Sequence, residues 1–175
     1  YKALRALGEV KHLVGPNAFH HLYLPKAAEL FPEATVWGPR ALKKKQPGLK
    51  LHVLGKTIPE AWGNDFEMLH LAGLKIQEYA FFHRASKTLI VTDLVFNLDQ
   101  PDLPTRLLTS LTGTHKGLAC SHLISKVMLS DKALLKKTLE TIYSWDFERV
   151  LMAHGAVLDI DAKARLQKAM AWVNN

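Results

Sequence analysis

Polar side chains stand at the ends of three separate strand-like apolar runs, and this arrangement constrains the fold more than any other feature of the sequence. They are found in residues 17–21 (Asn-Ala-Phe-His-His), at Thr92 and Asp93, and at His154 and Gly155. A strand in an α/β sheet buries its middle, so polar groups that meet in space do so at the carboxyl edge, where ligands bind. The three clusters therefore predict an α/β fold with a site at one edge of a sheet.

The composition of the chain predicts a soluble globular protein. Its 175 residues are 48% apolar and 22% charged, which suits one substantial core, so we expect a single domain over residues 1–175. No apolar run approaches the roughly 18 residues that cross a bilayer, and the single Cys120 excludes an internal disulfide. We therefore expect a cytoplasmic protein without a membrane partner. The sequence starts at Tyr1 with no signal-peptide pattern, which leaves open that an N-terminal piece has been removed.

The formal net charge of +7 raises the question of a nucleic-acid partner. The densest basic run, residues 40–45, has no aromatic residues within it, and the other lysines are scattered over amphipathic stretches. We interpret the charge as a solvated basic face, so nucleic acid is the less favoured partner and a small-molecule substrate the more favoured one. The sequence leaves the identity of the substrate and the oligomeric state open.

Strand and helix patterns alternate along the chain. The first third predicts a strand, a helix and a strand, which favours a parallel pair, at residues 10–14, 22–31 and 34–37. The middle predicts four short strands in hairpins or a meander, at residues 51–54, 66–71, 77–83 and 88–92. The last third predicts a helix capped by Asp131, a buried strand over residues 149–153 and a closing helix capped by Asp161.

The three clusters contain the side-chain types that hold transition metals. Imidazole and carboxylate groups bind zinc and similar ions, normally with three or four protein donors at about 2.0–2.2 Å. Asp93 is the most informative candidate, because it is flanked by apolar residues on both sides and would cost several kcal/mol if buried without cations, backbone N–H groups or a metal. The histidines have a simpler alternative: His20, His21 and His154 could be capping or hydrogen-bonding residues of loops.

Two other catalytic arrangements are less favoured by the sequence. A Ser/His/Asp triad of His83, Ser86 and Asp93 lacks the Gly-x-Ser-x-Gly elbow that exposes the nucleophile. Cys120 lies close to His122 in the sequence, but this does not show that their side chains meet, so a core or loop role is the simpler interpretation.

The motifs resemble those of a branch of the metallo-β-lactamase superfamily whose function is unknown. The resemblance rests on the N-x-x-H-H motif at residues 17–21, the T-D motif within residues 82–94 and the H-G motif within residues 145–155, and it spans nearly the whole chain. It implies an αβ/βα sandwich and a metal-dependent hydrolase that uses zinc, iron or manganese. Only one strand precedes His21 where several are usual in the superfamily, so we expect a sandwich that is reduced or truncated at its N-terminal strands.

The chain also departs from the superfamily pattern. If His20 and His21 occupy the place of the usual Asp-His pair, the two preceding histidines are replaced by Pro16 and Ala18, and a later one by Leu74. These side chains cannot bind a metal. The resemblance therefore implies at most a mononuclear site built from the second-metal half of the motif, with four candidate ligands: His20, His21, Asp93 and His154.

These departures leave two function classes. In the leading hypothesis, one ion, zinc first and iron or manganese as alternatives, serves a hydrolase in which His20 is a fourth ligand or general base. Glu78 would orient the site or act as acid or base, so His20, Asp93 and Glu78 are the catalytic candidates. The alternative is a non-catalytic binding or scaffold protein on the same fold, with no metal and a neutral hydrogen-bonded cluster in its place.

Overall fold

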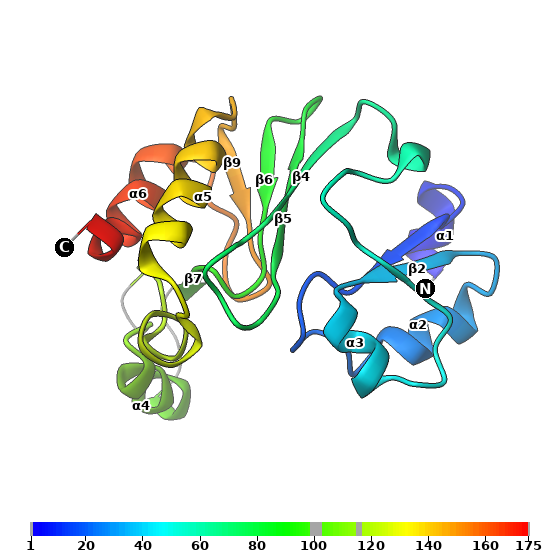
Figure 1. Ribbon diagram of the computed structural model, residues 1–175, viewed down its shortest axis with the longest axis horizontal. Coiled ribbons are helices and arrows are strands. Elements are labelled where there is room, and N and C mark those ends of the chain that lie inside the picture. The colour runs from blue at the N-terminus through cyan, green and yellow to red at the C-terminus, as the bar shows by residue number, and fades with distance from the viewer. Residues whose placement is uncertain (1, 99–102, 115–116, 175) are drawn as a thin grey trace.

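The computed structural model describes residues 2–98, 103–114 and 117–174. In this part of the chain the strands form two main sheets and one small two-stranded pair (Figure 1). The first is parallel, in the order β1 (His12–Val14), β2 (Thr35–Gly38), β3 (Leu51–Val53). The second has the order β4 (Phe66–His70), β5 (Tyr79–His83), β6 (Thr88–Ile90), β9 (Arg149–Leu151). Its pairs are antiparallel except β6–β9, which is parallel. A small antiparallel pair joins β7 (Phe96–Leu98) to β8 (Gly117–Ala119).

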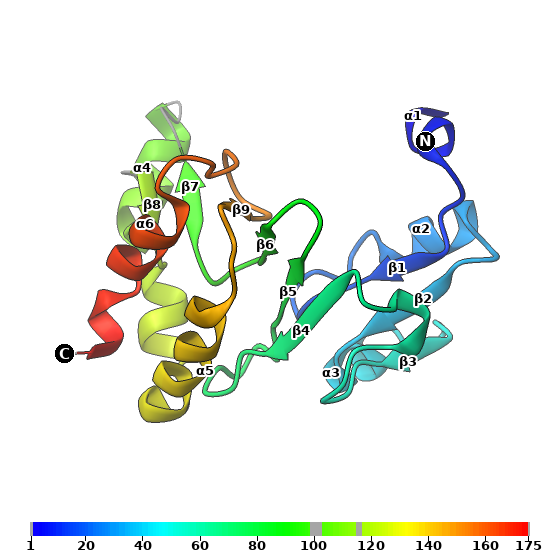
Figure 2. The same cartoon turned by 90° about the horizontal axis from the view of Figure 1, so that it is seen from above.

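Six helices accompany the strands: α1 (Lys2–Leu7), α2 (Leu24–Leu30), α3 (Arg40–Lys45), α4 (Leu103–Thr112), α5 (Lys132–Ser144) and α6 (Ala162–Ala169), within the described residues. Of these, α2 and α3 contact the first sheet, and α5 and α6 contact the second. Shorter helical segments are η1 (Glu60–Trp62), η2 (Leu123–Met128) and η3 (Ala171–Asn174). Figures 1 and 2 show α5 and α6 on one side of the second sheet and the β1–β3 part of the chain on the other. The layers thus run helix, sheet, sheet, helix, which is the αβ/βα order.

The largest core lies between the second sheet and its helices. Successive side chains of a strand point to opposite faces, and β5 follows this rule: Ala80 and Phe82 face the helices, whereas Tyr79 and Phe81 face the first sheet. The helix-facing core also takes Leu89 from β6 and Leu135 and Leu139 from α5. This layer anchors the strands whose ends carry Asp93 and His154.

The other two layers are much thinner. Between the first sheet and its helices the buried side chains are Leu24, Val36, Leu42 and Leu51. Between the two sheets they are Leu54, Tyr79 and Phe81, with partly buried aromatic and apolar residues around them. The space between the sheets is therefore incompletely filled by side chains.

Most of the sequence-based strand and helix predictions are confirmed. The first two strands pair in parallel, and β4, β5 and β6 form the expected antiparallel hairpins. The prediction for β3 was wrong, because it joins the first sheet in parallel with β2 after α3 carries the chain back, as a strand–helix–strand crossover does.

The predicted helix caps had different outcomes. The N–H of Leu134 donates to Asp131 Oδ1 at 2.9 Å, as expected of an N-cap at the start of α5. The prediction for Asp161 was right in position, since this residue directly precedes α6, but it has a φ of 50° and its side chain accepts no capping hydrogen bond. None of the helices in residues 2–98, 103–114 and 117–174 is long and apolar enough to cross a bilayer.

Candidate metal centre

Asp93 lies at the centre of the polar cluster that forms beyond the ends of β6 and β9. One of its oxygens, Oδ1, lies 3.0 Å from His154 Nε2 and 3.3 Å from His20 Nε2. His20 comes from the turn between β1 and α2, so the cluster joins the two sheets. The Asp93 side chain is 8% exposed, compared with 30% for His20 and 41% for His154. The carboxylate is thus buried, and the two imidazoles close it off from solvent.

Asn17 connects the first sheet to this carboxylate. Its amide Nδ2 donates to Asp93 Oδ2 at 2.6 Å and to Thr92 Oγ1 at 2.9 Å. Its Oδ1 accepts from the backbone N–H groups of Phe19 and His20 at 2.9 and 3.0 Å. Asn17 itself is fully buried. Its side chain therefore fixes both the turn that carries His20 and the oxygen of Asp93 that faces away from the histidines.

Glu78 holds the turn behind Asp93. Its carboxylate accepts from the backbone N–H groups of Thr92 at 2.8 Å, Asp93 at 3.1 and 3.2 Å, and Leu94 at 3.4 Å. Glu78 is fully buried just before β5, so this carboxylate serves as the partner that three successive N–H groups need. The arrangement favours the orienting role over the acid–base role for Glu78.

His154 is held by packing and by the turn that follows it. Its ring stacks on Phe96 with a centroid distance of 4.8 Å and an interplanar angle of 6°. Gly155 has a φ of 111°, and a Cβ there would lie 2.0 Å from the carbonyl oxygen of Asn97. Only glycine fits this approach. The His-Gly motif thus reflects a backbone requirement as well as a side-chain one.

The electrostatics of the cluster favour an ionised Asp93. Burial raises the pKa of its carboxyl, but the hydrogen bonds from His154 and His20 outweigh burial and hold this pKa well below its usual range. The hydrogen bond to Asp93 raises the pKa of His20, against the opposing effect of partial burial. Complete burial raises the pKa of Glu78, while the N–H donor of Thr92 counteracts it. The cluster therefore concentrates negative charge at Asp93, where a cation is favoured.

The donor geometry fits a single transition-metal ion. The three ligand atoms of His20, Asp93 and His154 all lie within 4.8 Å of one another. Donors about 2.1 Å from a tetrahedral ion lie about 3.4 Å apart, close to the observed nitrogen–oxygen separations of 3.0 and 3.3 Å. Two imidazoles and one carboxylate are also a common ligand set for such ions. This group could hold a metal ion, and the side chains of His20 and His154 are partly exposed to solvent.

His21 is not part of this group. Its Nδ1 lies 3.0 Å from Gln46 Nε2, and Gln46 also reaches the carbonyl oxygen of His21 at 3.4 Å. Gln46 follows α3, so His21 is engaged on the side of that helix. The structure therefore brings together three of the four candidate ligands from the sequence. The sequence suggested Asn17 as a cap of the following segment or as an oxygen donor to the metal, and the structure shows its oxygen accepting from backbone N–H groups of the turn. Phe96 is a support whose role the sequence pattern did not assign.

The less favoured catalytic arrangements do not coincide with this cluster. His83 Nδ1 lies 2.7 Å from Ser86 Oγ, but this exposed pair is at the other end of β5 and β6 from Asp93. Burial raises the pKa of the Cys120 thiol to about 12, so this residue is not a ready nucleophile at neutral pH.

The cluster opens into a cavity of about 660 Å³, called the site cavity below. His20, Asp93 and His154 contribute to its wall, together with apolar residues from β1 and from the β1–α2 turn, among them Val14, Pro16 and Leu22. Its volume lies within the range of small-molecule sites, roughly 300–1,000 Å³. The candidate ligands are therefore accessible to a small molecule.

Comparison with known proteins agrees with this architecture. The family described as "Domain of unknown function (DUF4336)" matches residues 2–112. No curated protein matches the sequence at a significant level. Among solved structures, that of VMB-1 at pH 5.5 superposes with a TM-score of 0.65 and 11% identity, covering 99% of this chain and 74% of that one.

Two further solved structures are similar in fold. The DIM-1 metallo-β-lactamase exposed to ceftazidime gives a TM-score of 0.60 and 15% identity, covering 98% of this chain and 72% of that one. The metal-soaked Flv1 flavodiiron core from Synechocystis sp. PCC6803 gives 0.64 and 11% identity, covering 99% of this chain and 46% of that one. At these identities the likeness establishes the fold, which is a metallo-β-lactamase fold in reduced form.

Proposed function

The chain belongs to the DUF4336 family, a domain of unknown function, and we propose that it is a metal-dependent hydrolase with one ion held by His20, Asp93 and His154. The observation that carries this proposal is the convergence of three ligand atoms, from turns far apart in the sequence, within 4.8 Å of one another. Zinc is the first candidate ion, because it is commonly bound by imidazole and carboxylate together. Iron and manganese are the alternatives to be tested beside it.

Each side chain of the centre has a distinct task in this proposal. A bound divalent ion supplies a Lewis acid that polarises a substrate oxygen and acidifies water. Asp93 contributes the negative charge that attracts the cation, and without an ion its Oδ1 keeps both imidazole Nε2 atoms turned toward the site. Asn17 keeps the other oxygen of Asp93 occupied, and Glu78 fixes the backbone that presents it.

His20 has two candidate roles, and they predict different results. As a ligand it completes the donor set, so His20→Ala lowers metal content and activity together. As a general base or acid it exchanges protons with water or the substrate, so His20→Ala leaves metal content near normal and lowers kcat alone. The hydrogen bond to Asp93 raises the pKa of His20 and so favours its protonated form, which suits a proton carrier. As a ligand, Nε2 would have to lose this proton before it binds the ion.

Metal content of the purified protein is the decisive measurement. After reconstitution with zinc, iron or manganese, we expect about one ion per chain in the wild type and near zero in Asp93→Asn, which keeps the shape but removes the charge. Asp159→Asn is the matched control, because Asp159 is exposed and should leave metal content unchanged. A stoichiometry near zero for all three metals in the wild type would exclude the proposal.

A substrate screen then tests the reaction. Phosphoesters, thioesters and lactones cover the main hydrolysable groups, and we expect turnover of at least one class that is lost on chelation and in Asp93→Asn. His21→Ala is a second control, because His21 neighbours His20 in sequence but is engaged with Gln46. If His21→Ala lowers metal content as strongly as His20→Ala, His21 must turn inward as a ligand when the ion binds.

The alternative function is a non-catalytic binding or scaffold role. It is favoured by the hydrogen bonds that Asp93 makes to His20, His154 and Asn17, which satisfy the carboxylate without an ion. In that case His154→Ala should lower the melting temperature of chelator-treated protein markedly, by several degrees, and metal should change neither protein. A clear rise in melting temperature with zinc in the wild type, absent in His154→Ala, argues against this alternative.

A further inference from the structure

The wall of the site cavity has a polar part and an apolar part. The polar part consists of the three candidate ligands. The apolar part comes from β1, the turn that follows it and the start of α2, and its large side chains are Leu13, Val14, Phe19, Leu22 and Tyr23. Among the described residues that line the cavity, none outside the polar part is acidic or is a lysine or an arginine. A molecule in this cavity therefore meets the candidate ligands in one region and mainly apolar side chains elsewhere.

The apolar part of the wall is largely exposed to solvent. Leu22 is 74% exposed, Tyr23 85% and Phe19 39%, although all three belong to the one turn between β1 and α2. Single apolar side chains on a surface are common, but several together beside polar residues are typical of ligand-binding grooves and other contact surfaces. Their exposure shows that no described segment of the chain covers them.

The turn that exposes these side chains is nevertheless held by other elements. The N–H of Ala18 donates to the carbonyl oxygen of Ile76 at 2.9 Å, and Asn17 Oδ1 accepts from the N–H of Phe19. Lys45 Nζ donates to the carbonyl oxygen of Ala18 at 2.7 Å and lies 5.3 Å from the centroid of the Phe19 ring. The apolar wall is thus fixed in place before any ligand arrives, as a binding site requires.

We propose that the substrate of the metal centre carries an apolar chain beside the group that is hydrolysed, and that this chain binds along Val14, Leu22 and Tyr23. The inference deepens the proposed function and rests on it for the word substrate, whereas binding of the chain does not require the ion. The carbonyl of an ester, thioester or lactone would lie at the polar part of the wall. Burial of methylene groups against the apolar part stabilises the complex. Polyhydroxylated or multiply charged chains are disfavoured, because this wall offers them few partners.

The straight-chain alcohols 1-butanol, 1-hexanol and 1-octanol test binding of the chain without any turnover. Ligand-observed NMR on chelator-treated protein measures their dissociation constants. Each methylene group tightens binding about fourfold when it is completely buried, and about twofold on a half-open wall. We therefore expect 1-octanol to bind more tightly than 1-butanol by roughly tenfold or more. Equal dissociation constants, or no binding of 1-octanol, overturn the inference.

Substitutions in the wall test where the chain binds. Leu22→Gln keeps the size of the side chain but makes it polar, and should weaken 1-octanol about threefold. The double variant Leu22→Gln/Ala27→Gln should weaken it about tenfold, because Ala27 also lines the cavity. Ile160→Gln is the matched control, since Ile160 is 70% exposed and is not part of this wall. If the double variant does not fold by circular dichroism, the exposed position 22 decides alone, and unchanged affinity in Leu22→Gln overturns the inference.

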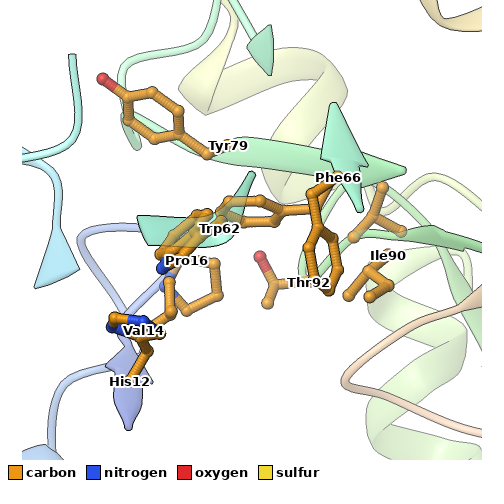
Figure 3. Close-up of a pocket in the computed structure, with 10 residues that line it drawn as sticks. His12, Val14, Pro16, Trp62, Phe66, Tyr79, Ile90 and Thr92 are labelled. Carbon is orange, nitrogen blue, oxygen red and sulfur yellow. The ribbon is translucent and has the colours of Figure 1, made fainter. Parts of the chain in front are cut away.

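A second cavity, between the two sheets, provides a control for non-specific uptake of apolar probes. Its volume is about 350 Å³, and Figure 3 shows Trp62, Phe66 and Ile90 in its wall. Ile90→Phe narrows this second cavity and should leave the affinity for 1-octanol unchanged, because Ile90 does not line the site cavity. Binding that is lost in Ile90→Phe but kept in Leu22→Gln would place the chain between the sheets and overturn the inference.

A second copy of the chain is the other occupant that the exposed wall could take. Sedimentation equilibrium of the wild type and of Leu22→Gln measures whether the wall joins two copies. A dimer that dissociates in Leu22→Gln, together with no binding of 1-octanol to the wild type, would make the wall a contact between copies and overturn the inference.

Activity measurements separate this inference from the proposed function. The acetyl and octanoyl thioesters of N-acetylcysteamine differ only in chain length, and hydrolysis of either consumes one water, breaks the C–S bond and yields a thiol, a carboxylate and a proton. With zinc-loaded protein we expect kcat/KM to be roughly tenfold higher for the octanoyl thioester, and this preference should shrink in Leu22→Gln. Hydrolysis without a chain preference leaves the function standing and overturns the inference. Chain-dependent binding of the alcohols without any hydrolysis supports the apolar binding wall, and then only the proposed function fails.

Discussion

The two faces of the second sheet differ sharply in how they are packed. The face toward α5 and α6 is buried in a continuous core, as the complete burial of Leu89, Leu135 and Val150 illustrates. On the face toward the first sheet, the buried apolar cluster of the described residues is small, with Tyr79 and Phe81 packed on Leu54, and a cavity remains. The candidate metal centre stands at the edge between these layers. Asp93 and His154 follow strands that are packed in the large core, and the space between the two sheets leaves room for a ligand.

The sharpest test of this contrast uses two phenylalanines that are neighbours in β5. Phe82 faces the helices and stacks on Trp145, whereas Phe81 lines the cavity. We expect Phe82→Ala to lower the free energy of unfolding by about 4 kcal/mol. Phe81→Ala should lower it by about 2 kcal/mol, because part of that ring already borders empty space. Urea unfolding at pH 7.5 measures both, and equal losses would contradict the contrast.

Replacement of Glu78 tests how much the turn that carries Asp93 contributes to the stability of the second sheet and its core. Glu78→Ala removes the acceptor of three backbone N–H groups, so we expect a loss of about 3 kcal/mol in unfolding free energy. Glu78→Gln keeps one carbonyl oxygen and should cost about half as much. The exposed Glu33→Ala provides the control and should stay within about 0.5 kcal/mol of the wild type. A loss no greater than in Glu33→Ala would show that the turn supports itself.

Asn17 tests the link between the two sheets. Asn17→Ala breaks the bonds to Asp93 and Thr92 and frees the turn of His20, so we expect a loss of about 2 kcal/mol in stability. If the proposed metal site exists, metal affinity should also fall by about 10- to 100-fold, as for other groups that orient ligands. The exposed Asn64→Ala is the control. Unchanged zinc affinity in Asn17→Ala would mean that Asp93 is oriented by other contacts.

Replacement of His70 should give the smallest effect on stability. It tests whether water reaches the face of the second sheet that is turned toward the first sheet. It pairs with Tyr79 across β4 and β5, and partial burial lowers the pKa of its ring. Its contribution to stability is therefore complete above the ordinary histidine pKa of the unfolded chain and is lost as the pH falls through the lowered value in the fold. Unfolding free energies at pH 7.5 and 5.5 should differ less in His70→Gln than in the wild type. The same difference in both proteins would place His70 in contact with water.

The sequence predicted those features that depend on nearby residues. The parallel pair β1–β2 followed from a strand, a helix and a strand in succession, and the Asp131 cap from a short polar residue before an apolar helix stripe. β3 was misplaced because a short apolar run does not reveal which sheet receives it. The cavity between the two sheets has no signal in the sequence. Its volume depends on side chains from five separate elements, β1, η1, β4, β5 and β6 with their adjoining residues, which together leave the space between the sheets unfilled.

The site itself was predicted in part for the same reason. Burial of a carboxylate at Asp93 made cationic or N–H partners necessary, and the structure supplies two imidazoles and the amide of Asn17. The sequence-based hypothesis made His21 a ligand and gave His20 the place of a fourth ligand or base, whereas in the structure it is His20 that joins Asp93 and His154. Adjacent, identical side chains carry no local signal for this choice. The choice depends on Gln46, which follows α3 and engages His21. Site residues whose partners lie on distant elements are therefore beyond the reach of local patterns.

The parallel pairing of β6 with β9 has a consequence for the order in which the chain folds. It brings together Asp93 and His154, which are 61 residues apart, and so closes a long loop before any contact between them is gained. Such non-local contacts form slowly, whereas the hairpins β4–β5 and β5–β6 close short loops and form early. The hairpins would thus be in place while the cluster of His20, Asp93 and His154 still lacks its second histidine, so the closing of this cluster during refolding reports on the docking of β9.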